Sequence, residues 1–219
     1  MDRIPFVSYD FFGYLSSGLV LVAGMQRVVG FPQVTGRELT VAEGALLILA
    51  IYVGGQVIAS PSRAFLEDLV VSKVLQRPHT VLLRERQPWR RLLFPGYYTA
   101  LPQTIRQRVI ERAKGEGTTE TGEALFLHIR FHEVTRQDEK LMARLEAFLN
   151  QYGFARNLAF TCLFVGVALV IKGRLSNDVA NLEYGVTAIV AALLLFYRYL
   201  KFFRQYTYEL FNSYAGGKR

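Results

Sequence analysis

Residues 157–173 read NLAFTCLFVGVALVIKG, and residues 184–200 read YGVTAIVAALLLFYRYL. Each stretch is almost free of charge and approaches the ~20 apolar residues that an α-helix needs to cross a bilayer. Two more such blocks lie nearer the N-terminus, so the sequence predicts transmembrane helices at about residues 8–29, 40–60, 156–172 and 182–201. The expected fold is an all-α integral membrane protein, with a small, mainly helical domain inserted between helices two and three.

The composition supports this segregated layout. Hydrophobic residues make up 51% of the chain, yet 20% of its residues are charged and the net charge is +8. The charge lies between and after the apolar blocks, which an ordinary soluble domain would not show. Cys162 is the only cysteine, so neither an intramolecular disulfide nor a cysteine zinc cluster is expected. We expect the first apolar block to be a retained anchor, because no cleavage-site pattern follows it.

Lysine and arginine predict the orientation. Residues 61–156 carry sixteen of them and the chain after residue 195 carries five, whereas each short loop between apolar blocks carries two. Basic residues near span ends concentrate on the cytoplasmic side. We therefore expect four parts: helices one and two in residues 1–60, a basic cytoplasmic domain in 61–155, helices three and four in 156–201, and an aromatic cytoplasmic tail in 202–219. Both termini are expected in the cytoplasm.

Two acidic residues lie at the starts of predicted spans. Asp10 is in a position that suits a helix cap, and Thr40 with Glu43 has the spacing of a capping box. Alternatively, one or both carboxylates face a water-filled path between helices and attract cations. Under that alternative the expected pore or gate residues are Asp10, Phe11, Phe12, Tyr14 and Glu43.

Small residues recur in the first two spans, and they allow close helix contacts in membranes. They are Gly13, Ser16 to Gly18, and Gly24 in the first span, and Gly44, Gly54 and Gly55 in the second. Packing within one four-helix bundle and packing between subunits both remain open from the sequence.

The insert is long enough for a domain. Pro61 and Ser62 are start signals for a helix that continues from span two and ends at Pro78, and three further prolines predict irregular structure or short helices up to residue 102. A helix with a glycine stop is expected at residues 103–117. Residues 122–134 alternate like a strand but also fit a helix, which we favour because no partner strand is evident. An amphipathic helix then leads into span three.

A basic block extends from Lys73 to Lys114, with ten basic residues, eight of them arginine, and two acidic ones. The block either lies on anionic lipid or binds a phosphate-rich ligand, and the arginine excess suits bidentate phosphate contacts. Trp89, Tyr97 and Tyr98 fit either interpretation, as interfacial rings or as stacking faces. The expected ligand-binding residues are Arg84, Arg86, Arg90, Arg91, Arg106, Arg108, Arg112, Lys114, His128, Arg130 and His132.

No catalytic motif is present in the sequence: it has no phosphate-binding glycine loop, nucleophile elbow or paired-carboxylate pattern. We therefore expect no enzyme activity and no cofactor. His128 and His132 are four residues apart, as in a helical zinc site, but no third ligand is evident, and Glu133 is expected to point elsewhere. The expectation is that the chain holds no metal.

The four-span layout, the size and the arginine stretches RERQPWRR (84–91) and RQRVIERAK (106–114) resemble small membrane effectors of bacterial anti-phage defence. Among these, the chain is similar to the ion-channel component of Hailong systems. The resemblance implies a homo-oligomer, expected to be a tetramer, in the bacterial inner membrane. It also implies a nucleotidyltransferase partner, whose DNA oligomer holds the channel closed at an electropositive surface.

The expected function is a channel or pore-forming effector gated by an anionic nucleotide or a DNA or RNA oligomer, most simply a single-stranded one, with membrane lipid as a further partner. The alternative is a membrane scaffold or accessory subunit whose basic block lies on anionic lipid and which recruits a protein partner. A transporter is disfavoured because no inverted repeat is visible in four spans.

Overall fold

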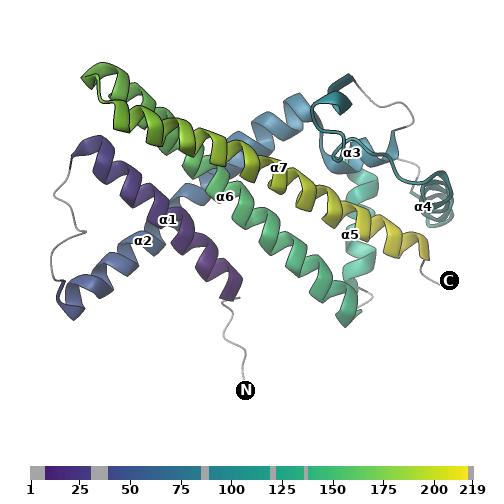
Figure 1. Ribbon diagram of the computed structural model, residues 1–219. Coiled ribbons are helices and arrows are strands. Elements are labelled where there is room, and N and C mark those ends of the chain that lie inside the picture. Colours follow the sequence, from purple (N-terminus) through teal and green to yellow (C-terminus); the bar gives the residue numbers. More distant parts are fainter. Residues whose placement is uncertain (1–7, 31–38, 85–88, 119–121, 136–137, 217–219) are drawn as a thin grey trace. The chain divides into compact units, whose positions relative to one another are not determined.

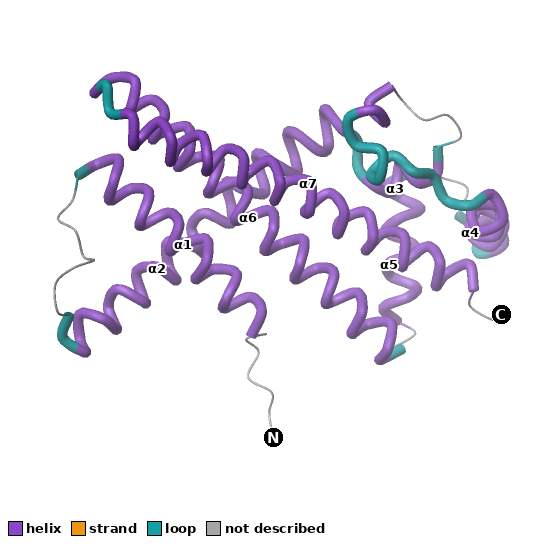
Figure 2. The backbone as a smooth tube through the Cα atoms, viewed as in Figure 1, coloured by secondary structure: helices purple, strands orange, loops and turns teal. Residues whose placement is uncertain are grey.

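The computed structural model describes residues 8–30, 39–84, 89–118, 122–135 and 138–216 (Figure 1). Helices dominate these residues, and no strand occurs among them (Figure 2). In chain order the elements are α1 (Ser8–Val29), α2 (Val41–Ser62), a π-helical segment η1 (Arg63–Leu75), α3 (Pro78–Leu83), a 3₁₀ turn η2 (Trp89–Leu92), α4 (Gln103–Gly115), α5 (Glu123–Thr135), α6 (Glu139–Ser176) and α7 (Val179–Gly216).

Four of the described helices are long and apolar enough to cross a membrane, as the sequence predicts. The bounds of α1 are those expected, and α2 is displaced by only one or two residues from its prediction. The third and fourth spans lie inside α6 and α7, which have 38 residues each and so exceed the ~20 that a bilayer requires. Large apolar side chains on these helices, such as Leu46, Val186 and Leu194, are exposed in the single chain. Such a surface suits contact with lipid.

The chain divides into two compact units. The first comprises residues 1–69 and 153–199 and contains the apolar helices. The second comprises residues 70–152 and 200–219, so the C-terminal tail folds with the insert although residues 153–199 separate them in the chain.

Glycines bring helices of the first unit into close contact. A Cβ atom on Gly18 would overlap the carbonyl of Ile51, and one on Gly55 would overlap the carbonyl of Tyr14, so α1 and α2 touch backbone to backbone. Gly13 of α1 lies against Phe154 of α6, and Gly24 of α1 lies against Val165 of α6. Internal packing therefore accounts for these four small residues. Gly44 differs, because a Cβ there would meet nothing within 4 Å.

The join between α2 and the insert departs from the sequence prediction. Pro61 lies inside α2, which continues to Ser62 and passes directly into η1, so Pro61 is not a start signal. The helical path ends at Leu75, because Gln76 adopts the left-handed region with a φ of 72°. Pro78 does not end this helix but occupies the first turn of α3, where its missing N–H has no consequence.

Tyr97 and Tyr98 are buried and hold the end of η1. The Tyr97 hydroxyl donates a hydrogen bond to the carbonyl of Gln76 at 2.6 Å, and the Tyr98 hydroxyl donates to Leu75 at 2.8 Å. These bonds satisfy carbonyls that a helix end leaves without intrahelical donors. The expectation that these two rings lie at a lipid interface or stack on bases is therefore wrong, because only 3% and 0% of their surfaces are exposed.

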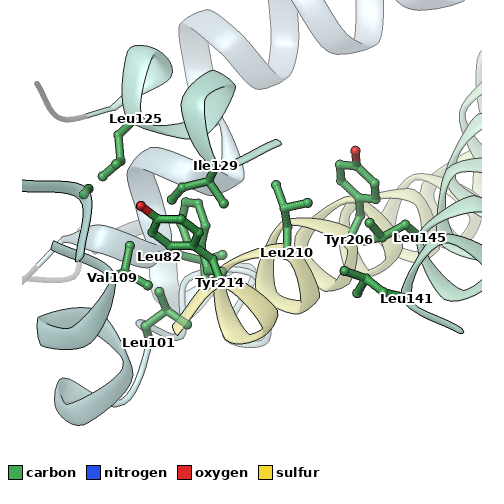
Figure 3. Close-up of a cluster of buried hydrophobic side chains, with 12 residues drawn as sticks. Leu82, Leu101, Val109, Leu125, Ile129, Leu141, Leu145, Tyr206, Leu210 and Tyr214 are labelled. Carbon is green, nitrogen blue, oxygen red and sulfur yellow. The ribbon is translucent and has the colours of Figure 1, made fainter. Parts of the chain in front are cut away.

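The tail part of α7 supplies much of the core of the second unit. Figure 3 shows Tyr206, Leu210 and Tyr214 of α7 among side chains contributed by α3, α4, α5 and α6. The helical interpretation of residues 122–134 is confirmed, since Leu125 and Ile129, one turn apart on α5, both enter this core. The predicted amphipathic helix before span three is the first part of α6, and Leu141 and Leu145 are buried as expected.

Candidate anion-binding pocket

A pocket of about 290 Å³ opens in the second unit between α3, α4 and α5. Two of the predicted ligand-binding arginines, Arg84 and Arg106, are part of its lining. The complete set of lining residues is Thr80, Leu83, Arg84, Arg106, Ile110, Gly122 and Leu125. None of these described residues is acidic.

Local structure explains how the two arginines meet. Arg84 directly follows the last residue of α3, and its amide donates to the carbonyl of Val81. The amide of Leu101 donates to the carbonyl of Leu82 at 3.0 Å, which ties the segment before α4 to α3. Pro102 is the N-cap of α4, and the amide of Arg106 donates a hydrogen bond to the carbonyl of Pro102 to close the first turn. Residues twenty-two positions apart are thereby brought to one pocket.

The lining combines cationic and apolar groups. Guanidinium groups bind phosphate through paired, charge-assisted hydrogen bonds. Thr80 adds a hydroxyl, while Leu83, Ile110 and Leu125 offer apolar surface for a flat or aliphatic group. The volume is near the lower end of the ~300–1,000 Å³ usual for small-molecule sites. The pocket therefore suits one nucleotide-sized group rather than several.

The other predicted ligand residues do not join this pocket. Arg91, Arg108, Lys114 and Arg130 are exposed, and Arg112, His128 and His132 belong to a second cluster described below. Arg86 and the side chain of Arg90 lie outside the described residues. Binding by any of these groups stays a prediction.

The second cluster surrounds a carboxylate that sequence reasoning missed. Glu116, at the end of α4, accepts hydrogen bonds from Arg112 Nε at 3.0 Å and from the Tyr214 hydroxyl at 2.7 Å, and lies 2.9 Å from His128 Nε2. Arg112 also donates to the carbonyl of Tyr214 at 2.7 Å, and its guanidinium lies 4.6 Å from the centre of that ring. We call Arg112, Glu116, His128, His132, Glu133 and Tyr214 the Glu116 cluster.

Glu133 is the second carboxylate of the cluster, and its side chain is fully buried. Its Oε2 accepts a hydrogen bond from the Ser213 hydroxyl at 2.6 Å, and its Oε1 lies 3.3 Å from His132 Nδ1. The expectation that Glu133 points away from His132 is therefore wrong. Burial of a carboxylate requires such partners. The spacing of Arg112 and Glu116, one helical turn apart, was the only local signal for this cluster.

These contacts connect the end of α7 to α4 and α5 in three places. Arg112 lies on α4 and Glu116 is the C-cap of that helix, His128 and Glu133 lie on α5, and Tyr214 lies on α7. Outside the cluster, Arg144 of α6 pairs with Glu209 of α7 at 2.6 Å. Arg112 and His128 thus have carboxylate partners inside the Glu116 cluster, whereas the described residues that line the Arg84–Arg106 pocket include no acidic side chain.

The Glu116 cluster predicts a specific acid sensitivity. Desolvation by burial raises the pKa of Glu116, but hydrogen bonds from Tyr214, His128 and Arg112 outweigh it and lower this pKa from its usual 4.5 to about 2. A carboxyl group with a depressed folded-state pKa stabilises the fold above its unfolded-state value and loses that contribution as the pH falls toward the folded-state value. The stabilisation should therefore be complete above about pH 4.5 and disappear toward pH 2.

We expect Glu116→Gln to lower the melting temperature at neutral pH, and the difference from wild type to shrink between about pH 4.5 and 2. Thermal melts of the detergent-solubilised chain over this range measure it. Glu146→Gln, which changes an exposed glutamate of α6, is the matched control. A difference that stays constant with pH would contradict the assigned role of the Glu116 carboxylate.

The predicted gate residues fall in the first unit. Phe11 and Phe12 are exposed on α1, and the Phe11 ring lies 5.4 Å from that of Tyr52. Glu43 completes a capping box: the Thr40 amide donates to its carboxylate at 2.9 Å, and the Glu43 amide donates to the Thr40 hydroxyl at 3.3 Å. The predicted cap is thus confirmed for Glu43. The side chain of Asp10 lies outside the described residues. A pore role for these residues stays a prediction.

No group of three or more potential metal ligands occurs among the described histidine, cysteine and acidic side chains. Comparison of the chain with protein-family models, with curated proteins and with solved structures found no match.

Proposed function

We propose that this chain is one subunit of a homo-oligomeric channel or pore-forming effector, acting in anti-phage defence at a bacterial inner membrane. A nucleotide, or one end of a DNA or RNA oligomer, controls it by binding the Arg84–Arg106 pocket. The observation that carries this proposal is the pocket itself, with two arginines over apolar walls in the unit formed by the insert and the tail. With both termini and the insert in the cytoplasm, the pocket is open to cytoplasmic ligands.

The continuity of α7 supports control of the spans by this pocket. α7 is one helix from Val179 to Gly216 and contains both the fourth apolar span and the tail. Its tail residues Leu210 and Tyr214 share a core with Val109 of α4 and Leu125 of α5. A ligand that displaces α4 or α5 therefore acts on the same helix that contains the span, with no intervening loop.

The first test is conductance of the purified full-length chain in planar bilayers, with and without a single-stranded oligonucleotide on the basic-domain side. We expect an oligomer in detergent, an ion current, and a change of that current when oligonucleotide is added. A monomer that never conducts would contradict the channel proposal and favour the membrane scaffold. Nuclease treatment and mass spectrometry of co-purifying material would show whether the natural anion is an oligonucleotide or a product of a nucleotidyltransferase.

A further inference from the structure

A short turn of the second unit exposes leucines to solvent outside the apolar helices. It consists of η2 and the next residue, Trp89 to Leu93, and we call it the Trp89–Leu93 turn. Leu92 is 88% exposed and Leu93 is 65% exposed, whereas Leu82 and Leu125 of the same unit are almost completely buried. Transfer of one leucine side chain from water into an apolar phase is favoured by a factor of about 10 or more.

The sequence around this turn is strongly basic. Residues 84–91 contain four arginines and one glutamate, and Arg91 is exposed next to Leu92. Arginine next to exposed leucine and a tryptophan is the combination found in segments that lie in the headgroup region of a bilayer. Anionic lipid attracts each arginine, while the leucines enter the boundary of the acyl chains.

A lipid surface fits this turn better than a protein partner does. Two leucines offer far less than the ~800 Å² that each side of a stable protein interface buries. Membrane insertion needs no such area here, because the turn is tethered to the apolar helices of the same chain, which raises its effective concentration at a bilayer. The strongly basic surroundings also match an anionic surface, which neutral apolar protein surfaces do not provide.

We propose that the Trp89–Leu93 turn inserts into the headgroup region of an anionic membrane, with Leu92 and Leu93 at the acyl boundary and Arg91 on lipid phosphate. The proposal depends on the chain being a membrane protein but not on a ligand in the Arg84–Arg106 pocket or on channel activity. It assigns the two arginine groups separate roles: those of the pocket bind a soluble anion, and Arg91 binds the bilayer.

The tryptophan content of the chain provides a direct test, because Trp89 is its only tryptophan. The full-length chain is reconstituted into phosphatidylcholine vesicles with or without phosphatidylglycerol, containing lipids brominated near the headgroup. We expect Trp89 fluorescence to be quenched by the brominated lipids, more strongly with phosphatidylglycerol present, and to be shielded from aqueous iodide.

The double variant Leu92→Ser/Leu93→Ser should weaken insertion by about 100-fold, since each leucine contributes about 10-fold, and should make Trp89 accessible to iodide. Leu127→Ser, at another half-exposed leucine of the same unit, is the matched control and should leave the quenching unchanged. Because both turn leucines are exposed, the variant should keep the circular dichroism and elution volume of the wild type.

Two results would overturn the proposal. Quenching of wild-type Trp89 by iodide but not by brominated lipid would place the turn in water. Protection from both quenchers would show that protein, rather than lipid, covers the turn.

Discussion

Replacing Arg106 by glutamate is expected to weaken binding of a single-stranded oligonucleotide by at least about 100-fold, because it removes one paired guanidinium contact and adds a negative charge beside the phosphate. Arg106 is the half-buried arginine of the pocket and lies on α4, between the apolar residues that anchor this helix. Arg84→Glu acts at the exposed rim of the same pocket and should cost less, about 10-fold, since solvent screens an exposed charge.

Fluorescence anisotropy of a labelled oligonucleotide with the detergent-solubilised chain measures both affinities. Lys140→Glu is the control, because it makes the same charge reversal at an exposed position of α6 outside the pocket. Arg108→Glu separates two models, since Arg108 is exposed on α4 but does not line the pocket. Equal losses for Arg106→Glu, Arg108→Glu and Lys140→Glu would mean that affinity follows net charge alone, which would refute a defined pocket.

The spans were predictable from the sequence because a bilayer imposes a length on them. α1 begins and ends where its apolar block does, and α6 and α7 contain the other blocks as expected. The connections between helices were less predictable, because a proline shows that one backbone N–H is missing but not whether a helix begins, ends or continues there. Pro61 stays within α2, and the change from α-helical to π-helical spacing comes after it, in η1. Pro78 lies in the first turn of α3 rather than ending a helix.

The site was only partly predictable, because composition shows which residues are charged but not which residues they contact. Arg84 and Arg106 were among the eleven predicted ligand residues, but nothing local distinguished them from Arg112. Arg112 has a carboxylate one turn away and a carbonyl acceptor 102 residues later in the chain, at Tyr214. The hydrogen bond between Glu116 and Tyr214 spans 98 residues. Such contacts depend on how α7 packs against α4, which no local pattern specifies.

Helix packing in the first unit depends on contacts that are similarly non-local, but here the residue type itself was informative. Small residues predict close approach, and five of the six glycines singled out from the sequence lie against another helix, with Gly44 as the exception. Gly44 was not distinguishable from them by residue type. The difference between Gly44 and Gly55, both on α2, is whether another backbone lies over the Cα atom.

Gly55→Ala should destabilise the chain although it adds a single methyl group. The new Cβ would overlap the carbonyl of Tyr14, and because that neighbour is backbone, α1 and α2 must separate to make room. Overpacking of this kind costs about 1–3 kcal/mol, which corresponds to a fall of roughly 2–12 °C in the melting temperature of a chain of this size. Thermal melts in one detergent, followed by loss of the native elution peak, measure the shift.

Gly44→Ala is the matched control, because it makes the same change on the same helix where the new Cβ meets nothing within 4 Å. Alanine favours helix over glycine by up to about 1 kcal/mol, so this variant should melt at the same temperature as the wild type or slightly higher. Opposite signs for the two variants are therefore the expected result. If Gly55→Ala also leaves the melting temperature unchanged, α1 and α2 do not touch at Tyr14, and the close backbone contact that joins the first two spans is absent from the folded protein.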